Sequence, residues 1–364
     1  MRGCWRIVFV VCVFILAGCS VQKMAGESLI DYAKAEAIPY LMAQDDLASA
    51  CAMGEGMSPV MLSLSRIGVA TDDVGVGMLM ASGMCAERVQ REAELDKARA
   101  LYANASVQAQ DALIREKQGH YLSARRMYAA YAHALAAFGD LSQGCRRYKT
   151  VELELLSLLG LASGALAILH DFSSEKALGI SLDVPVKIEK AAGCFDDSRW
   201  WGMPTALRAS IWLSIPGSGP EGVDPLAALE EAAQKGDAQG VGLARAMLVQ
   251  MSAAVGRQDV MCQAIEEAAR VETANASYAM LNAYARDMIA HQADLAWVRS
   301  KGHRAPFLVL QCPSETPVVV SMSDSEVDDL LDGLGDDADD LPSGADAAEG
   351  LSDEFGEDPH GDDA

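Results

Sequence analysis

The chain has 364 residues, 51% of them hydrophobic, and a formal net charge of −23. The acidic excess lies at the C-terminus, because the residues from Met322 onward include 13 Asp and 4 Glu and no Lys or Arg. Since this tail carries −17 of the total, the preceding chain carries only −6, and the absence of a basic stretch excludes the electrostatic footprint of a nucleic-acid-binding protein.

The first 18 residues have the pattern of a secretory signal peptide. Arg2 and Arg6 precede an apolar run at residues 7–17, which is shorter than the roughly 20 residues that a membrane span needs. The run ends in the small residues of "LAGC", which resembles the bacterial lipobox, in which the cysteine thiol is acylated and the chain is cut just before it. We therefore predict a lipoprotein signal peptide at residues 1–18 and lipidation at Cys19; the alternative is a signal peptide followed by a chance cysteine.

The residue after the predicted acylation site indicates the destination of the chain. Ser20, in place of Asp, is typical of lipoproteins that pass to the outer membrane. A lipid on Cys19 ties a chain to a membrane without spanning it, so we predict an outer-membrane lipoprotein that faces the periplasm, with residues 19–42 as the lipidated N-terminus and tether.

Residues 43–305 are predicted to form an all-α domain. Apolar residues recur at steps of three and four, and breaks at Gly, Pro and Asp divide the stretch into about ten to thirteen helices. The uncharged run at residues 155–169 spans only 15 residues, so we expect a buried helix there instead of a transmembrane one. Gly160 and Gly164, four residues apart, would let a neighbouring helix approach closely.

Two stretches resemble helical repeats. "GHYLSARRMYAAYAHAL", residues 119–135, resembles the second helix of a tetratricopeptide (TPR) repeat. "ALEEAAQKGDAQGVGLARAML", residues 228–248, resembles a Sel1-type repeat, in which Gly236 is expected to end one helix and Asp237 to begin the next. These stretches predict an array of helical hairpins of the TPR/Sel1 type; the alternative is an irregular bundle of ordinary hairpins.

The sequence contains none of the motifs that identify common enzymes. It has no GxxxxGK[ST], GxSxG or HExxH pattern and no His/Cys pair with the spacing of zinc ligands. His170, near the end of an apolar helix, is expected to cap the C-terminal carbonyls of that helix. Asp45 and Asp46 are expected in a first helical turn and Glu55 in a loop. We predict no catalysis, no metal and no cofactor beyond the covalent lipid.

Six cysteines remain once those of the signal peptide and Cys19 are set aside. The periplasm permits disulfides, and six cysteines allow 15 pairings between which the sequence does not choose. The alternative is that several are small buried residues with free thiols, and both interpretations stay open. The six are Cys51, Cys85, Cys145, Cys194, Cys262 and Cys312.

The segment at residues 195–225 holds three of the five tryptophans. Pro204 suits the first turn of a helix, which Pro216 and the nearby glycines end. One interpretation is an aromatic clamp that pins a loop to the core. The other is a ligand groove, in which the indoles hold an apolar ligand and an arginine pairs with its carboxylate. The groove would consist of Arg199, Trp200, Trp201, Arg208 and Trp212.

The C-terminal residues divide into two parts. Residues 306–321 are predicted to be an extended segment packed on the helical body, and residues 322–364 a disordered acidic tail, since they contain too few apolar groups to offset chain entropy. Within the tail, apolar residues at helical spacing could fold on a partner surface; the alternative is a tail that only solvates. These apolar residues are Val327, Leu330, Leu331 and Leu334.

Taken together, residues 43–270 resemble the TatT family, the lipoprotein T component of some tripartite ATP-independent periplasmic (TRAP) transporters. The likeness covers the early block "SPVMLSLSRI", the helix at residues 119–135, the Gly/Ala-rich helix at residues 155–169, and the tryptophan segment before a proline-linked helix pair. The acidic tail lies outside it. The resemblance implies a helical lipoprotein that associates with a periplasmic solute-binding protein and binds small apolar or carboxylate ligands, with trimers known in the family; it assigns no individual residue.

The expected function is therefore binding, as an accessory to TRAP-type solute uptake. The alternative is a helical-repeat scaffold for envelope assembly or for protein–protein interaction.

Overall fold

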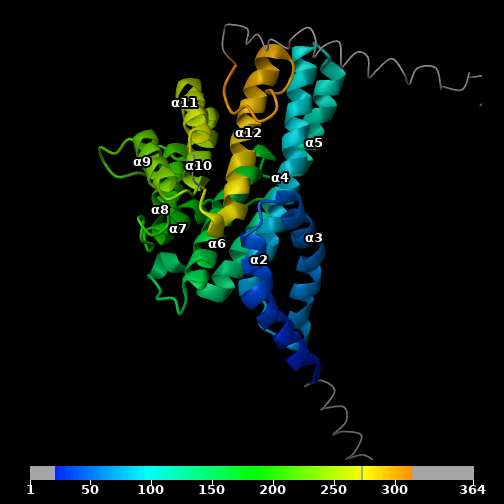
Figure 1. The fold of residues 1–364 in the computed structure, drawn as a ribbon, viewed down its shortest axis with the longest axis vertical. Helices are drawn as coiled ribbons and strands as arrows, with labels where there is room; N and C mark the ends of the chain where they lie inside the picture. Colours follow the sequence, from blue (N-terminus) through cyan, green and yellow to red (C-terminus); the bar gives the residue numbers. More distant parts are fainter. Residues whose placement is uncertain (1–20, 272–273, 314–364) are drawn as a thin grey trace, which may run out of the picture. The chain divides into compact units, whose positions relative to one another are not determined.

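The computed structural model describes residues 21–271 and 274–313, which contain eleven α-helices and no strand (Figure 1). This confirms the all-α prediction. Residues 21–32 are also helical and lead through a π-helical turn, Ala33–Ala37, into α2. The α-helices are α2 (Ile38–Met42), α3 (Leu47–Ser63), α4 (Asp72–Tyr102), α5 (Ser106–Phe138), α6 (Val151–Ser173), α7 (Val184–Ala192), α8 (Met203–Ser214), α9 (Pro225–Ala238), α10 (Leu243–Ala254), α11 (Gln258–Ala269) and α12 (Ala279–Lys301).

Several predictions fall wholly or partly outside the described residues. The signal peptide, Cys19, residues 314–321 and the acidic tail at 322–364 all lie there. Residues 21–42, predicted as part of the tether, are helical, and residues 304–313 contain neither helix nor strand.

The long helices α4 and α5 form a hairpin (Figure 1). Asp72 and Asp73 open α4, where carboxylates favour the positive end of the helix dipole. At Gly119 of α5, an added Cβ would come within 2.7 Å of the Cβ of Gln90 on α4. Gly119 therefore lets the two helices touch.

Helix α6 packs against α5 along the predicted glycine seam. A Cβ at Gly160 would collide with the Cβ of Ala134, and one at Gly164 would lie 2.8 Å from the ring of Tyr131. Within the described part of the chain, α6 is the one helix long and apolar enough to cross a membrane by length and composition. Its close packing on α5 accounts for that composition equally well, because a core helix is also apolar on most sides.

The join between α9 and α10 corrects the expectation for the Sel1-like stretch. Helix α9 continues through Gly236 and Asp237, and α10 begins at Leu243. The residue with positive φ is Gly240, at +70°, while the N–H of Val241 donates to the carbonyl of Gly236. This is the hydrogen-bond pattern of a Schellman cap with Gly240 as its left-handed residue, so Gly236 serves close packing and does not end the helix.

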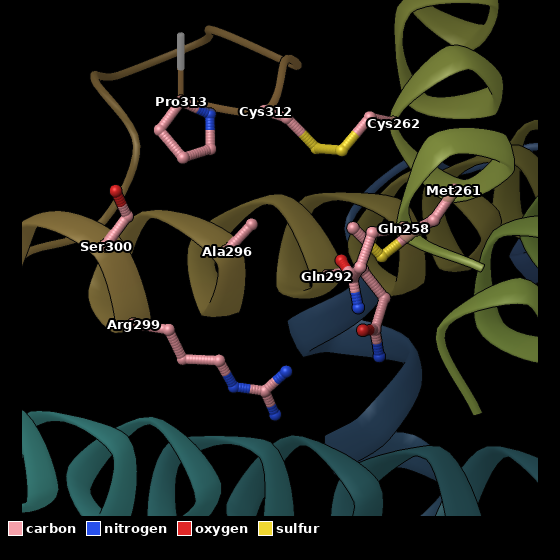
Figure 2. Close-up of a pocket in the computed structure, with 9 residues that line it drawn as sticks. All are labelled: Gln258, Met261, Cys262, Gln292, Ala296, Arg299, Ser300, Cys312 and Pro313. Carbon is pink, nitrogen blue, oxygen red and sulfur yellow. A yellow bond between two sulfur atoms is a disulfide. The ribbon is translucent and has the colours of Figure 1, made fainter. Parts of the chain in front are cut away.

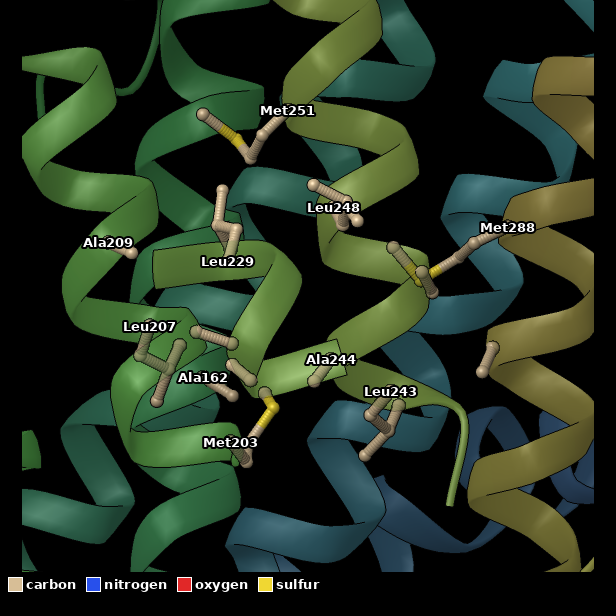
Figure 3. Packing of buried hydrophobic residues seen from close by; sticks show 14 of the residues in the cluster. Ala162, Met203, Leu207, Ala209, Leu229, Leu243, Ala244, Leu248, Met251 and Met288 are labelled. Carbon is tan, nitrogen blue, oxygen red and sulfur yellow. The ribbon is translucent and has the colours of Figure 1, made fainter. Parts of the chain in front are cut away.

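Short helices of the C-terminal half enclose the largest apolar core (Figure 3). Leu207 of α8, Leu229 of α9 and Leu248 of α10 are each at most 1% exposed. Alanines between them, such as Ala162 and Ala244, leave room for the helices to approach, so the core alternates large and small side chains as close packing requires.

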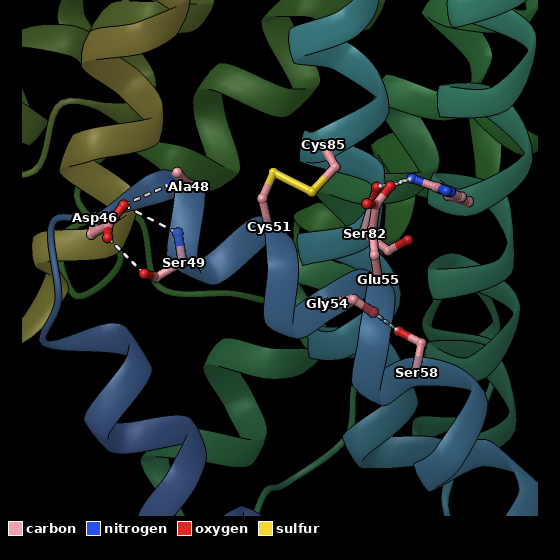
Figure 4. The surroundings of a disulfide bond; sticks show 10 residues. Asp46, Ala48, Ser49, Cys51, Gly54, Glu55, Ser58, Ser82 and Cys85 are labelled. Carbon is pink, nitrogen blue, oxygen red and sulfur yellow. Dashed lines mark hydrogen bonds and ion pairs between the residues drawn. A yellow bond between two sulfur atoms is a disulfide. The ribbon is translucent and has the colours of Figure 1, made fainter. Parts of the chain in front are cut away.

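The start of α3 matches the expectation for one acid and corrects another (Figure 4). Asp46 is the N-cap of α3 and accepts hydrogen bonds from the N–H groups of Ala48 and Ser49. Glu55, expected in a loop, lies inside α3 and pairs with Arg126 of α5 at 2.6 Å. The helix continues past Gly54 because that glycine packs directly on the backbone of α4.

All six cysteines of the described residues are paired, which decides between the two interpretations left open by the sequence. Each bond joins cysteines that are neighbours in the order of the six, with Cα–Cα distances of 5.1, 5.2 and 5.5 Å. The first ties α3 to α4 (Figure 4), the second ties the end of α7 to the segment before α6, and the third ties residue 312 to α11. The bonds are Cys51–Cys85, Cys145–Cys194 and Cys262–Cys312.

The glycine seam can be tested by adding one methyl group. We expect Gly160→Ala to reduce the free energy of unfolding by about 1–3 kcal/mol, since the methyl overpacks the contact with Ala134. Gly56→Ala is the matched control, because no atom lies within 4 Å of its added Cβ, and it should be neutral or stabilise by up to about 1 kcal/mol. Urea denaturation measures the free energy of unfolding of both variants. Equal changes in the two would contradict the close packing proposed at Gly160.

Candidate functional site

A cluster of polar side chains is buried where α12 packs on α4, next to α5 and α6. Its members on α4 recur at steps of four and three residues, and those on α12 at three and four, so each helix turns one polar stripe into its contact face. The stripes are Glu87, Arg91 and Glu94 on α4 and Tyr284, Asp287 and His291 on α12, joined by Glu116 and His120 of α5 and by His170 of α6.

Glu87 is the centre of this buried network and is 1% exposed. Its Oε1 accepts a hydrogen bond from Nε2 of His170 at 2.8 Å, and its Oε2 accepts from the hydroxyl of Tyr284 at 2.6 Å and from Arg91 at 2.9 Å. Burial alone would raise its pKa, but the His170 hydrogen bond and the Arg91 charge outweigh burial and lower the pKa of Glu87 to about 2. The carboxylate is therefore a permanent buried charge at neutral pH.

Arg91 and Tyr284 complete the environment of that charge. The guanidinium of Arg91 lies between Glu87 and Asp287, its Cζ 5.7 Å from the centre of the Tyr284 ring. Burial opposes its charge, but Glu87 prevails and raises the pKa of Arg91. Burial, together with the charge of Glu87, raises the pKa of Tyr284 well above its usual range, so the phenol stays a proton donor.

His170 and His120 share a hydrogen bond between their Nδ1 atoms, which are 2.8 Å apart. Such a bond needs one proton between the two nitrogens, so one ring donates and the other accepts. Burial and the neighbouring His170 lower the pKa of His120 to about 4, and its ring is neutral at neutral pH. His120 therefore takes up a proton only in acid.

The network continues beyond the histidine pair. Nε2 of His120 lies 3.9 Å from Oε1 of Glu116, whose other oxygen pairs with Lys97, and burial raises the pKa of Glu116. On the other side, Glu94 accepts a hydrogen bond from Nε2 of His291 at 2.9 Å. Burial opposes ionisation there too, but the His291 bond prevails and lowers the pKa of Glu94 to about 2.

The position of His170 corrects the sequence prediction. It lies in the last turn of α6, but its side chain is buried and points to Glu87 and His120, so it does not cap the helix. Asp171, its neighbour, instead binds the following loop by accepting from the N–H groups of Leu178 and Ile180 at 2.8 Å each. The side chain of His170 is buried because residue 170 lies on the side of α6 that meets α4.

Most members of the network are not predicted from the sequence, because the histidines are scattered along the chain. The available signal was the spacing of charged residues on α4 and α12, which puts them on one face of each helix. That signal is weak, because a solvated helix surface shows the same spacing. Chemically, the network can hold charges and move protons between neighbouring groups.

A cavity of about 330 Å³ lies between α11, α12 and the Cys262–Cys312 disulfide (Figure 2). Its apolar wall includes Met261, Ala296 and the disulfide itself. Its polar lining is Gln258, Gln292, Arg299 and Ser300. The volume is at the lower end of the range for small-molecule sites.

Arg299 is the cationic group of this cavity. Its side chain is 58% exposed, and the nearest carboxylate oxygen, on Glu94, is 4.0 Å away and belongs to a group that already accepts from His291. The guanidinium can therefore receive a further anion. Arginine binds carboxylates in a bidentate manner, so the cavity combines an anion-binding group with an apolar wall.

The first pair of residues of the predicted tryptophan groove gathers around Glu154. Trp200 is 1% exposed and donates from Nε1 to Oε1 of Glu154 at 2.9 Å, while Arg199 pairs with the other oxygen at 3.3 Å. Trp201 is also buried and lies edge-on to Tyr278, with ring centres 4.4 Å apart.

The second pair gathers around Glu189. Arg208 pairs with Oε1 of Glu189 at 3.0 Å, Trp212 donates to the same oxygen at 3.2 Å, and the guanidinium lies 4.9 Å from the Trp212 ring centre. Both arginines thus already have carboxylate partners in the chain, and all three indoles are buried. This geometry favours the aromatic clamp over the ligand groove.

Comparison of the chain with protein families, with curated proteins and with solved structures finds no match. Among the described residues, no group of three or more His, Cys, Asp or Glu side chains is arranged to hold a metal ion.

The buried charge of Glu87 can be tested by neutralising it without changing its shape. We expect Glu87→Gln to reduce the free energy of unfolding by about 3–5 kcal/mol, because Arg91 would keep a buried charge without its main partner. Glu55→Gln, which breaks a more exposed ion pair with Arg126, should cost less than about 1 kcal/mol. Urea denaturation at pH 7 measures both, and similar losses would show that the buried charge has no special role.

The histidine pair predicts how stability depends on pH. The unfolded chain binds a proton at His120 near pH 6.5 and the folded chain only near pH 4, so stability should fall as the pH drops through this window. His120→Gln should reduce the slope between pH 4.5 and 6 by up to about 1 kcal/mol per pH unit. Denaturation midpoints across this range measure it, with His133→Gln on the same helix as the control; an unchanged slope in the His120 variant would contradict the assignment.

Proposed function

We propose that the mature chain is a lipid-anchored protein on the periplasmic side of the outer membrane and that it acts by binding, as an accessory component of a TRAP-type uptake system. The observation that carries this proposal is the pairing of all six cysteines of the described residues into three disulfides. Disulfides persist in the periplasm and are rare in the cytosol, so the pairing agrees with the predicted signal peptide.

The cavity beside α12 supports a binding role and indicates the chemistry of a ligand. The guanidinium of Arg299 would pair with a carboxylate, and the wall formed by Met261 and Ala296 would contact an apolar chain. These are the ligand properties that the resemblance to the TatT family implies, although they occur in a different place from the predicted tryptophan groove.

The short helices α7 to α11 support the proposed array of repeat-like hairpins. Successive members pack on one another, as α8 does on α9 and α9 on α10, which is the arrangement by which helical repeats build a surface for a protein partner. In this proposal the partner is the periplasmic solute-binding protein of the uptake system.

A second candidate function, an envelope scaffold without a ligand, is favoured by one observation. The last turn of α4 and the first turn of α5 expose Leu101, Tyr102 and Val107, with exposed fractions of 61%, 53% and 78%. Exposed apolar side chains that lie close together are typical of protein-docking surfaces. If Val107→Asp abolished partner capture from envelope extracts while Arg299→Ala left it intact, the scaffold would be the better description.

The ligand proposal is tested by titrating the purified protein with octanoate, a small apolar carboxylate. We expect saturable binding by calorimetry and at least about a tenfold weaker affinity for Arg299→Ala, since a charge-assisted hydrogen bond contributes about 1.5–3 kcal/mol. Arg270→Ala removes an exposed arginine outside the cavity and should keep the affinity of the parent. Absence of binding, or equal loss in both variants, would reject the cavity as a carboxylate site.

A further inference from the structure

The helix at residues 21–32 has one face buried against the body. Ile30 is 2% exposed and packs with Met61 and Val69, and a Cβ at Gly26 would lie 2.9 Å from the side chain of Val69. Just beyond this helix, Lys34 forms an ion pair with Asp73 of α4 at 2.6 Å. These contacts fix the helix to the rest of the described residues.

The opposite face of the same helix is exposed and apolar. Val21, Met24, Leu29 and Tyr32 have exposed fractions of 56%, 62%, 37% and 58%. At 3.6 residues per turn, these four side chains fall within an arc of about 140°. We call them the outer face. Ser28 lies within this arc, and its hydroxyl is satisfied by the carbonyl of Met24 at 3.0 Å.

The charged side chains of this segment lie together on one flank of the outer face. They follow one another at steps of four residues, which aligns them along the helix, and the outer face itself contains no charge. They are Lys23, Glu27 and Asp31. The helix therefore has two apolar faces. One packs against the protein, and no described residue covers the other.

The position of the outer face in the sequence, next to Cys19, indicates what the outer face contacts. Only Ser20 separates the helix from Cys19, so acyl chains on Cys19 would hold Val21 at the membrane surface. Amphipathic helices bind in the interfacial plane of a bilayer through apolar side chains of this kind. We propose that the outer face of residues 21–32 lies on the lipid surface and that the lipoprotein is held there in a fixed orientation; this inference rests on the proposed lipid anchor.

The orientation follows from the buried face. Because Ile30 and the Lys34–Asp73 pair fix the helix to the body, contact between the outer face and lipid would set how α3 and α4 are presented to the membrane. A lipid on a flexible tether would leave the body free to tumble.

The test is depth-dependent quenching of tryptophan fluorescence by brominated phospholipids. The acylated full-length protein is reconstituted in phosphatidylethanolamine/phosphatidylglycerol vesicles, with Met24→Trp on the outer face and Glu27→Trp on the charged flank. The parent protein gives the baseline, since Trp200, Trp201, Trp212 and Trp297 are buried and shielded from lipid. We expect at least twofold stronger quenching of the Met24 variant than of the Glu27 variant.

The outcomes separate this inference from the proposed anchor. Protein that binds vesicles but shows equal quenching in the two variants would overturn the inference and leave the anchor in place. Protein that does not bind vesicles at all would overturn both. If the protein formed a dimer in detergent and Met24→Glu dissociated it, the outer face would be a contact between two copies of the chain. That result would also overturn the lipid assignment.

Discussion

The buried carboxylate of Glu87 is the constraint on which much of the helix arrangement depends. A charge that is 1% exposed must be surrounded by donors, and Glu87 obtains them from three helices: Arg91 on α4, His170 on α6 and Tyr284 on α12. Tyr284 is 197 positions away in the sequence. Any other register of α12 against α4 would leave charges buried without partners, so the network selects one packing among the many that apolar faces alone would allow.

The glycine seam and the disulfides place the helices so that this network can form. Gly160 and Gly164 bring α6 against α5, and with it His170 against His120. The disulfides then hold segments that have little regular structure of their own, such as the residues around Cys145 and Cys312. The same bond at Cys312 forms a wall of the cavity, so the element that ties the end of the described chain to α11 also shapes the candidate ligand site.

The two candidate sites are linked through Glu94. This carboxylate belongs to the buried network through His291 and is also the nearest carboxylate to Arg299 in the cavity, at 4.0 Å. In the tryptophan segment, Glu154 and Glu189 already accept from the indoles and pair with the arginines, which favours the aromatic clamp over the ligand groove.

The sequence by itself determined what depends on neighbours along the chain: the all-α class, the acid at the start of α3 and the proline in the first turn of α8. It also predicted the close approach at Gly160 and Gly164. Only the tertiary structure decided the role of His170, the packing of Gly236 and the pairing of the cysteines, because each depends on a partner brought close by folding. Helical periodicity shows which residues share a face, but it does not show what that face meets.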